Sequence, residues 1–164
     1  MSKAFTSAGT LISISDGIPL LYNRKNLREL SWYEIGEVVD ITEFGRDYVD
    51  VTHNSIKERR TVKKKGSRNE GSFIITLAKK MSDLGQSILK VGLNETRQYP
   101  FRVVLPDTTI QYFPGLITSM RDNYSDADSM ASSTFSIDIN KDILLKVFIS
   151  ESGWYNYYFE IPVF

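Results

Sequence analysis

The sequence contains no cysteine among its 164 residues, and this absence excludes several kinds of chemistry. Without thiols there are no disulfide staples, no thiolate zinc sites and no cysteine nucleophile, and the composition fits a reducing cytoplasm. No apolar run approaches the ~20 residues that a transmembrane helix needs, and residues 1–9 hold no apolar segment typical of a secretory signal. The 20 basic and 20 acidic residues balance, so no net charge directs the chain toward nucleic acid or a membrane.

Residues suited to catalysis are also scarce. His53 is the only histidine, and no second type of metal ligand lies near it at metal-binding spacing. The sequence has no nucleophile elbow, no phosphate-binding glycine loop and no zinc-protease helix motif. Asp126 and Asp128 form a carboxylate pair, but solvated loop acids are the ordinary interpretation of such a pair. We therefore expect a protein that is not an enzyme, with no catalytic residue, no metal and no cofactor.

Aromatic residues are plentiful, with nine Tyr, nine Phe and two Trp, and many stand in alternating runs. Alternation of apolar and polar residues is the pattern of a strand with one face on a core. The clearest runs are 72–77, 99–105 and 134–140. We expect a mainly β protein forming one domain over residues 1–164, with an N-terminal arm at 1–9 and an aromatic C-terminal extension at 147–164.

One stretch, residues 82–92, carries helical signals instead. Either Ser82 or Asp83 offers an oxygen that can cap the first free amides, and Gln86 follows three residues after Asp83. The predicted apolar stripe consists of Leu84, Ile88 and Val91 with Leu89 beside them, and Gly92 suits a left-handed helix end. A helix of about ten residues is not stable alone, so it must pack against the sheet. The charged stretch 23–30 is predicted to be a loop.

The segment 54–70 interrupts the alternating pattern with dense positive charge. Its basic residues are Lys57, Arg59, Arg60, Lys63, Lys64, Lys65 and Arg68. Like charges at this density repel, so we expect an exposed, poorly ordered loop in the monomer. Connections this long inside a compact domain are uncommon, and they tend to be functional or disordered. The loop lacks the interleaved aromatics of a nucleic-acid stacking platform, which favours contact with protein over binding of DNA.

Acidic residues gather just before this segment. They are Glu34, Glu37, Asp40, Glu43, Asp47 and Asp50, and Arg46 is the only basic residue among them. Two interpretations stay open: a solvated strand face, or a negatively charged surface that meets a basic partner or repels a polyanion. Asp126 and Asp128 provide a second acidic segment. On the second interpretation, acids from at least one of these segments form a surface that repels DNA.

Seven runs stand in a consistent order along the chain: GTLISISDG (9–17), EIGEVVDIT (34–42), VDVTHNS (49–55), GSF (71–73), DLGQSIL (83–89), FRVVLP (101–106) and YFPGLITS (112–119). Together these runs, within residues 9–142, resemble the major tail tube proteins of long non-contractile-tailed bacteriophages. No single run is specific, but their order and spacing are. Two features depart from the family pattern. The segment 54–70 is more basic than expected, and the aromatic end after Lys146 matches no part of it.

The resemblance implies a β-sandwich or barrel-like domain with one flanking helix. It implies hexameric rings that stack into a hollow tube, through which the genome leaves the virion. The family's long loop crosses to neighbouring subunits and rings, and residues 54–70 occupy its place. Further implied partners are the tape measure protein, the tail terminator and distal tail proteins, while DNA passes without specific binding and no membrane takes part. Assembly is expected in the bacterial host cytoplasm.

A competing interpretation is a monomeric β-barrel module that binds nucleic acid or protein through its basic loop. Related tube or terminator proteins of contractile tails and secretion machines share the implied fold and form a second alternative. Size in solution separates the module from a tube protein, because only the latter polymerises at high concentration.

Overall fold

The computed structural model describes residues 6–56, 60–125 and 128–146. The predicted aromatic extension at 147–164, most of the N-terminal arm and the basic residues Lys57 and Arg59 lie outside this description. The elements are β1 (Leu11–Ile14), α1 (Arg24–Arg28), β2 (Tyr33–Glu34), β3 (Val38–Ile41), β4 (Asp47–Ser55), β5 (Arg60–Asn69), β6 (Ser72–Ala78), α2 (Leu84–Gly92), β7 (Tyr99–Val104), β8 (Ile110–Asn123), β9 (Ser132–Ile139) and β10 (Leu144–Lys146).

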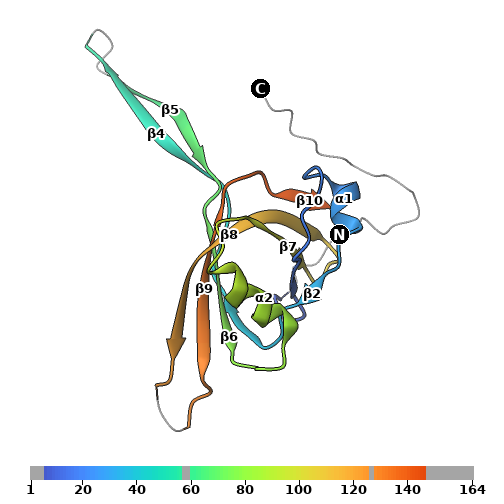
Figure 1. Ribbon diagram of the computed structural model, residues 1–164. Helices are drawn as coiled ribbons and strands as arrows, with labels where there is room; N and C mark the ends of the chain where they lie inside the picture. The colour runs from blue at the N-terminus through green and yellow to red at the C-terminus, as the bar shows by residue number, and fades with distance from the viewer. Residues whose placement is uncertain (1–5, 57–59, 126–127, 147–164) are drawn as a thin grey trace.

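Most strands join one antiparallel sheet in the order β2-β1-β7-β8-β9-β6-β3, with β10 also paired to β8. The long strand β8 organises this sheet, because its first half pairs with β7 and its second half with β9. Gly115 is the junction, since it faces Tyr99 on one side and Ile139 on the other. β8 curves over the body, so the sheet is curled into a barrel-like shape (Figure 1). The expected mainly β fold is confirmed.

The core lies inside this curled sheet and follows the predicted alternation. Its buried members include Phe73, Ile75 and Leu77 of β6, Phe101 and Val103 of β7, and Phe135, Ile137 and Ile139 of β9. The rings of Phe101 and Phe113 stack with centroids 5.5 Å apart, and Phe73 meets Phe113 edge-on at 5.3 Å. Burial of each such side chain stabilises the fold by roughly 1.5–3 kcal/mol.

Helix α2 forms where predicted, and Asp83 caps it by accepting the backbone N–H of Gln86 at 2.8 Å. The predicted apolar stripe is wrong at Leu84 and Val91, which are 65% and 56% exposed, whereas Leu89 is buried and Ile88 packs against the core. The buried positions are Gly85, Gln86, Leu89 and Gly92. Small residues on this face let the helix backbone approach the sheet closely. Accordingly, Gly92 is no left-handed stop but the last residue of the helix.

Gln86 fastens the helix to the loops beneath it. Its side-chain N–H groups donate to the carbonyls of Gly36 at 3.1 Å and Ala78 at 3.0 Å, and its oxygen accepts the N–H of Lys80 at 3.1 Å. The side chain is almost completely buried, so each of these bonds satisfies a group that has little access to water. A second, short helix, α1, occupies part of the segment predicted as a loop, with Asn23 as its cap and Leu27 buried.

Most described residues of the segment expected to be a loop at 54–70 belong instead to a β-hairpin, in which residues 60–69 form strand β5. Strands β4 and β5 pair with each other in a separate two-stranded sheet, which we name the arm (residues 47–69). Figure 1 shows the arm projecting away from the body. The expectation of a loop was wrong because β pairing sends successive side chains to opposite faces, which separates the adjacent lysines of β5. Among the described helices, none is long and apolar enough to cross a membrane.

Candidate assembly surfaces

The arm has two chemically different faces, because directly paired residues of an antiparallel ribbon project to the same side. The polar face holds the pairs Asp50–Lys65, Thr52–Lys63 and Asn54–Thr61. The valine face holds the pairs Val51–Lys64 and His53–Val62. Gly66 lies beside this second face, where a Cβ would stand 2.7 Å from a methyl group of Val51. The arm is therefore an amphipathic ribbon.

Neither face of the arm is covered within the subunit. In the part of the chain that the structure describes, β4 and β5 pack extensively only against each other. Val51 is 51% exposed on the valine face, and Ile56, next to the tip, is 99% exposed. A two-stranded hairpin is at best marginally stable in water by itself, and grouped exposed apolar residues mark interaction sites. The arm is thus suited to contact with another surface.

Four charged residues gather where the arm joins the body, and we name them the root clamp (Arg46, Arg68, Glu70 and Asp142). Glu70 is only 6% exposed. It accepts a hydrogen bond from Nε of Arg46 at 3.0 Å and forms an ion pair with Arg68, whose Nε lies 2.8 Å from the Glu70 carboxylate. Asp142 lies in the β9–β10 connection and accepts hydrogen bonds from Nη2 of both arginines. The distance from Nη2 of Arg46 to the Asp142 carboxylate is 3.4 Å. Two positive and two negative charges balance.

The electrostatics of Arg46 follow from this arrangement. Burial alone lowers its pKa, but the hydrogen bond and the charge of Glu70 outweigh that effect, and the pKa lies above its ordinary value. Arg46 therefore remains charged, and Glu70 keeps a compensating partner in its buried position.

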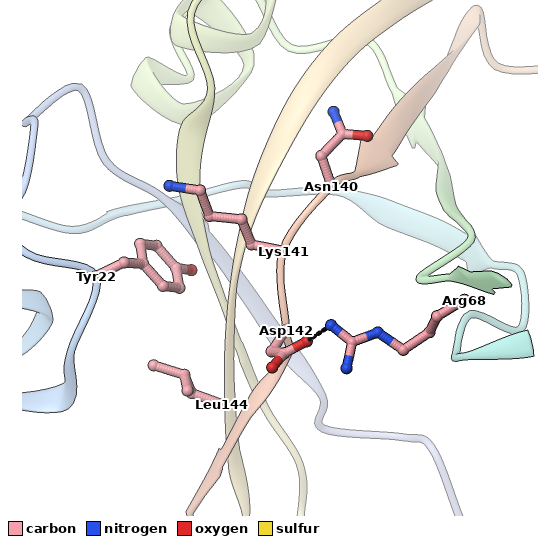
Figure 2. Close-up of a pocket in the computed structure, with 6 residues that line it drawn as sticks. All are labelled: Tyr22, Arg68, Asn140, Lys141, Asp142 and Leu144. Atoms are coloured by element: carbon pink, nitrogen blue, oxygen red, sulfur yellow. Dashed lines mark hydrogen bonds and ion pairs between the residues drawn. The ribbon is translucent and has the colours of Figure 1, made fainter. Parts of the chain in front are cut away.

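A hollow of about 380 Å³ lies beside the root clamp. Figure 2 shows the side chains that line it, with Arg68 reaching Asp142 from one side and Tyr22 and Leu144 standing opposite. The hydroxyl of Tyr22 is buried and has no hydrogen-bond partner among the described residues. Burial is the main reason why the pKa of Tyr22 is raised above its ordinary value.

The basic residues predicted for subunit contact have two different surroundings in the structure. Arg60, Lys63, Lys64 and Lys65 are exposed along β5. Lys65 lies over the ring of Tyr48, with 4.6 Å between its Nζ and the ring centroid. Arg68 differs from these four because it is paired in the root clamp.

The predicted acidic residues are all exposed where the structure describes them, but they do not lie on one strand. Glu34 is on β2, Asp40 on β3, and Asp47 and Asp50 on β4, while Glu37 and Glu43 lie in connections. Asp50 faces Lys65 across the arm, so part of the acidic segment meets the basic segment within one subunit. Asp128 is exposed, and Asp126 is outside the described residues.

The far end of the β8–β9 hairpin holds a charged cluster that the sequence analysis missed. Nζ of Lys79 lies 2.7 Å from Oδ2 of Asp122, and the hydroxyl of Ser133 donates to Oδ1 of Asp122 at 2.7 Å. The hydrogen bond with Asp122 raises the pKa of Lys79, and the same bond lowers the pKa of Asp122. Sequence distance hid the cluster, since its members come from the ends of β6, β8 and β9.

Several strand edges are open in the described part of the chain, among them edges of β8 and β3. The pairings at Gly115 place β7 and β9 on opposite sides of β8, so residues 116–123 have no strand neighbour on the β7 side. β3 pairs only with β6 and leaves its other edge free. Unpaired edges offer backbone N–H and C=O groups to another chain.

Comparison with known proteins identifies the family of this chain. Residues 20–142 match the family model described as "Lambda phage tail tube protein, TTP". The chain belongs to this family. It is a tube-forming structural protein and a virion component, as the resemblance of the seven sequence runs predicted.

Solved structures share the fold of this tail tube protein. The native gene transfer agent virion contains a chain with a TM-score of 0.64 and 18% identity, covering 88% of this chain and 100% of its own. The SPP1 tail tube gives a TM-score of 0.60 at 14% identity, with coverages of 86% and 78%. A chain of the anti-feeding prophage baseplate gives 0.66 at 15%, with coverages of 88% and 97%. No curated protein matches the sequence.

Proposed function

We propose that this chain acts as a single tube-forming domain, of which six copies close into a ring, and that the rings stack into the conduit for genome delivery of a non-contractile tail. The observation that carries the proposal is the family membership over residues 20–142. Two structures with the same fold are described with sixfold symmetry, the anti-feeding prophage baseplate and a gene transfer agent tail. Open strand edges and a projecting arm are features that a head-to-tail ring can use.

The arm is the element that we assign to contact between subunits. Its uncovered valine face supplies apolar area, while Lys63 and Lys65 on the polar face supply charge. In this arrangement the basic residues Lys57, Arg59, Arg60, Lys63, Lys64 and Lys65 meet acidic residues of a neighbour, among which Glu34, Asp40 and Glu43 are exposed on the body. Arg68, predicted with them, is instead paired within its own subunit. A single exposed ion pair contributes only ~0–1 kcal/mol, but a lattice repeats it at every copy.

The bore of the tube is proposed to be net negative. A basic wall would hold DNA, because each neutralised phosphate releases counterions into solution. Acids of the 34–50 segment or the 122–128 segment are the candidates for this lining, and alternation along each strand permits only every second residue to face it. The basic residues of the arm then lie outside the bore or at ring contacts.

Further partners follow from the place of such a tube in a tail. The tape measure protein, the tail terminator and distal tail proteins are proposed to meet the tube inside or at its ends. A chain from the cap that terminates the anti-feeding prophage tube has the same fold, with a TM-score of 0.65 at 8% identity. Assembly is proposed to take place in the bacterial host cytoplasm.

Negative-stain electron microscopy of concentrated purified protein tests the proposal. Hollow tubes with sixfold end views are the expected result, and a reconstruction of the wall shows which side chains line the bore. A protein that stays monomeric in size-exclusion chromatography at every concentration, and binds a partner through the arm, would instead be the binding module. A bore lined mainly by Lys63, Lys64 and Lys65 would overturn the assignment of the charges.

A further inference from the structure

Two glycines, Gly45 and Gly71, form the joint between the arm and the body. Gly71, which follows β5, has a φ of +79°, and a Cβ there would stand 2.7 Å from the carbonyl oxygen of Gly45. Gly45 itself has no heavy atom within 4 Å of its Cβ position. The two chain segments that carry the arm therefore meet at a pair of glycines, which place few side-chain limits on bending.

Two hollows lie at this joint. One, of about 380 Å³, is lined by Arg68 and Asp142, and the other, of about 370 Å³, is lined by Gly45, Arg46 and Gly71. Neither strand of the arm packs extensively on a body element among the described residues. Packing alone therefore does little to fix the angle at which the arm leaves the body.

The root clamp crosses this joint and ties three segments together. Arg46 precedes β4, Arg68 lies near the end of β5, and Asp142 belongs to the body between β9 and β10. Buried Glu70 is paired with Nε of both arginines, and Asp142 is paired with Nη2 of both arginines. Because an arginine fork has a planar, fixed geometry, two forks converging on two carboxylates define an orientation as well as an attraction.

We propose that Arg46, Arg68, Glu70 and Asp142 are positioning residues that fix the direction of the arm in the free subunit, before any neighbour is bound. The arm then presents its valine face at a set angle. Pre-orientation lowers the ordering cost of association, so the clamp favours growth of the lattice. Only this last consequence rests on the proposed function, since the orientation is a property of the single chain.

The absence of cysteine permits a direct measurement, because two introduced cysteines are the only positions that a spin label modifies. Thr52→Cys places one label on the arm, and Val91→Cys places the other on exposed α2. Pulsed electron-spin distances are recorded with the labelled chain diluted in excess unlabelled chain, so that distances within one subunit dominate. Glu70→Gln and Asp142→Asn are the clamp variants. Asp16→Asn is the matched control, since it removes one exposed carboxylate that has no clamp contact.

The expected result is one narrow distance distribution for the parent and for Asp16→Asn, and a distribution at least twice as wide for both clamp variants at unchanged circular dichroism. A broad distribution in the parent overturns the proposal, and so does a narrow, unshifted one in both clamp variants. If Glu70→Gln fails to fold, Asp142→Asn decides, because Asp142 is partly exposed and its loss leaves Glu70 paired. Failure of tubes in the microscope tests the proposed function separately.

Discussion

The carboxylate of Asp83 accepts the backbone N–H of Gly36 at 3.0 Å, although 47 positions separate the two residues in the chain. Its other oxygen accepts the N–H of Gln86 at 2.8 Å and thereby caps α2. One side chain thus starts the helix and also fastens it to the connection between β2 and β3.

Asp83→Ala is therefore expected to lower the free energy of unfolding by about 2–3 kcal/mol, because it removes a helix cap and a second hydrogen bond together. Asp83→Asn keeps one oxygen acceptor, and an intermediate loss is expected. Urea unfolding followed by circular dichroism measures both. A loss for Asp83→Ala no greater than that of Ser129→Ala, at an exposed site, would contradict the double role.

Gly92→Ala is expected to destabilise the protein by about 1–3 kcal/mol, against the usual preference of helices for alanine. The added methyl group would stand 2.6 Å from Cδ1 of Ile117 and 2.9 Å from Cε2 of Tyr99, both buried. Gly45→Ala is the control, since its Cβ meets nothing within 4 Å. Thermal unfolding compares the two variants, and an increase in Tm for Gly92→Ala would show that the helix face is not tightly packed there.

Reversal of Lys63, Lys64 and Lys65 to Glu is expected to block tube growth while the fold is retained. The three side chains are exposed on the arm, so the body keeps its core, but a neighbour's acidic surface would now repel them. Electron microscopy counts tubes, and circular dichroism checks the fold against a Lys25→Glu, Arg28→Glu control on α1. Normal tubes from the triple variant would exclude this contact. Tight duplex binding by the parent monomer, with a steep salt slope, would point to DNA instead.

The pair Lys79–Asp122 gives the β8–β9 hairpin a defined pH dependence. The pKa of Asp122 lies below its ordinary value of 3.8 because Lys79 and Ser133 bond the charged form. A lowered carboxyl pKa contributes stability above the ordinary value, and that contribution is lost as the pH falls through the folded pKa. Asp122→Asn is expected to lower Tm at pH 6, with a difference from the parent that shrinks below pH 4. An equal difference at pH 6 and pH 3 would show that charge is not involved.

Alternation in the sequence was enough to predict β6, β7 and β9 and the faces that they bury. It failed in part at α2 for a physical reason. Gly85 and Gly92 permit close approach on a face beside the apolar stripe, so Leu89 is buried but Leu84 and Val91 are exposed. It failed at β5, because lysines occupy consecutive positions on both faces of that strand and hide the period of two. The basic residues of β5 were recognised as a group from composition alone.

The root clamp was beyond the reach of sequence reasoning. Arg68 and Asp142 are 74 positions apart, and no local pattern connects them. Only the return of the chain from β9 to β10 brings Asp142 beside the arm.

The pairings of β1 and β8 also govern how the chain acquires its structure during synthesis. Ser13 of β1 meets Arg102 of β7 across 89 positions, and β8 is complete only when β9 has followed it. Strand β1 therefore lacks its partner β7 when it leaves the ribosome, and contacts of such long range make folding slow. Subunits are expected to complete folding only after nearly the whole chain has left the ribosome. The rate of folding then limits the supply of subunits that can polymerise.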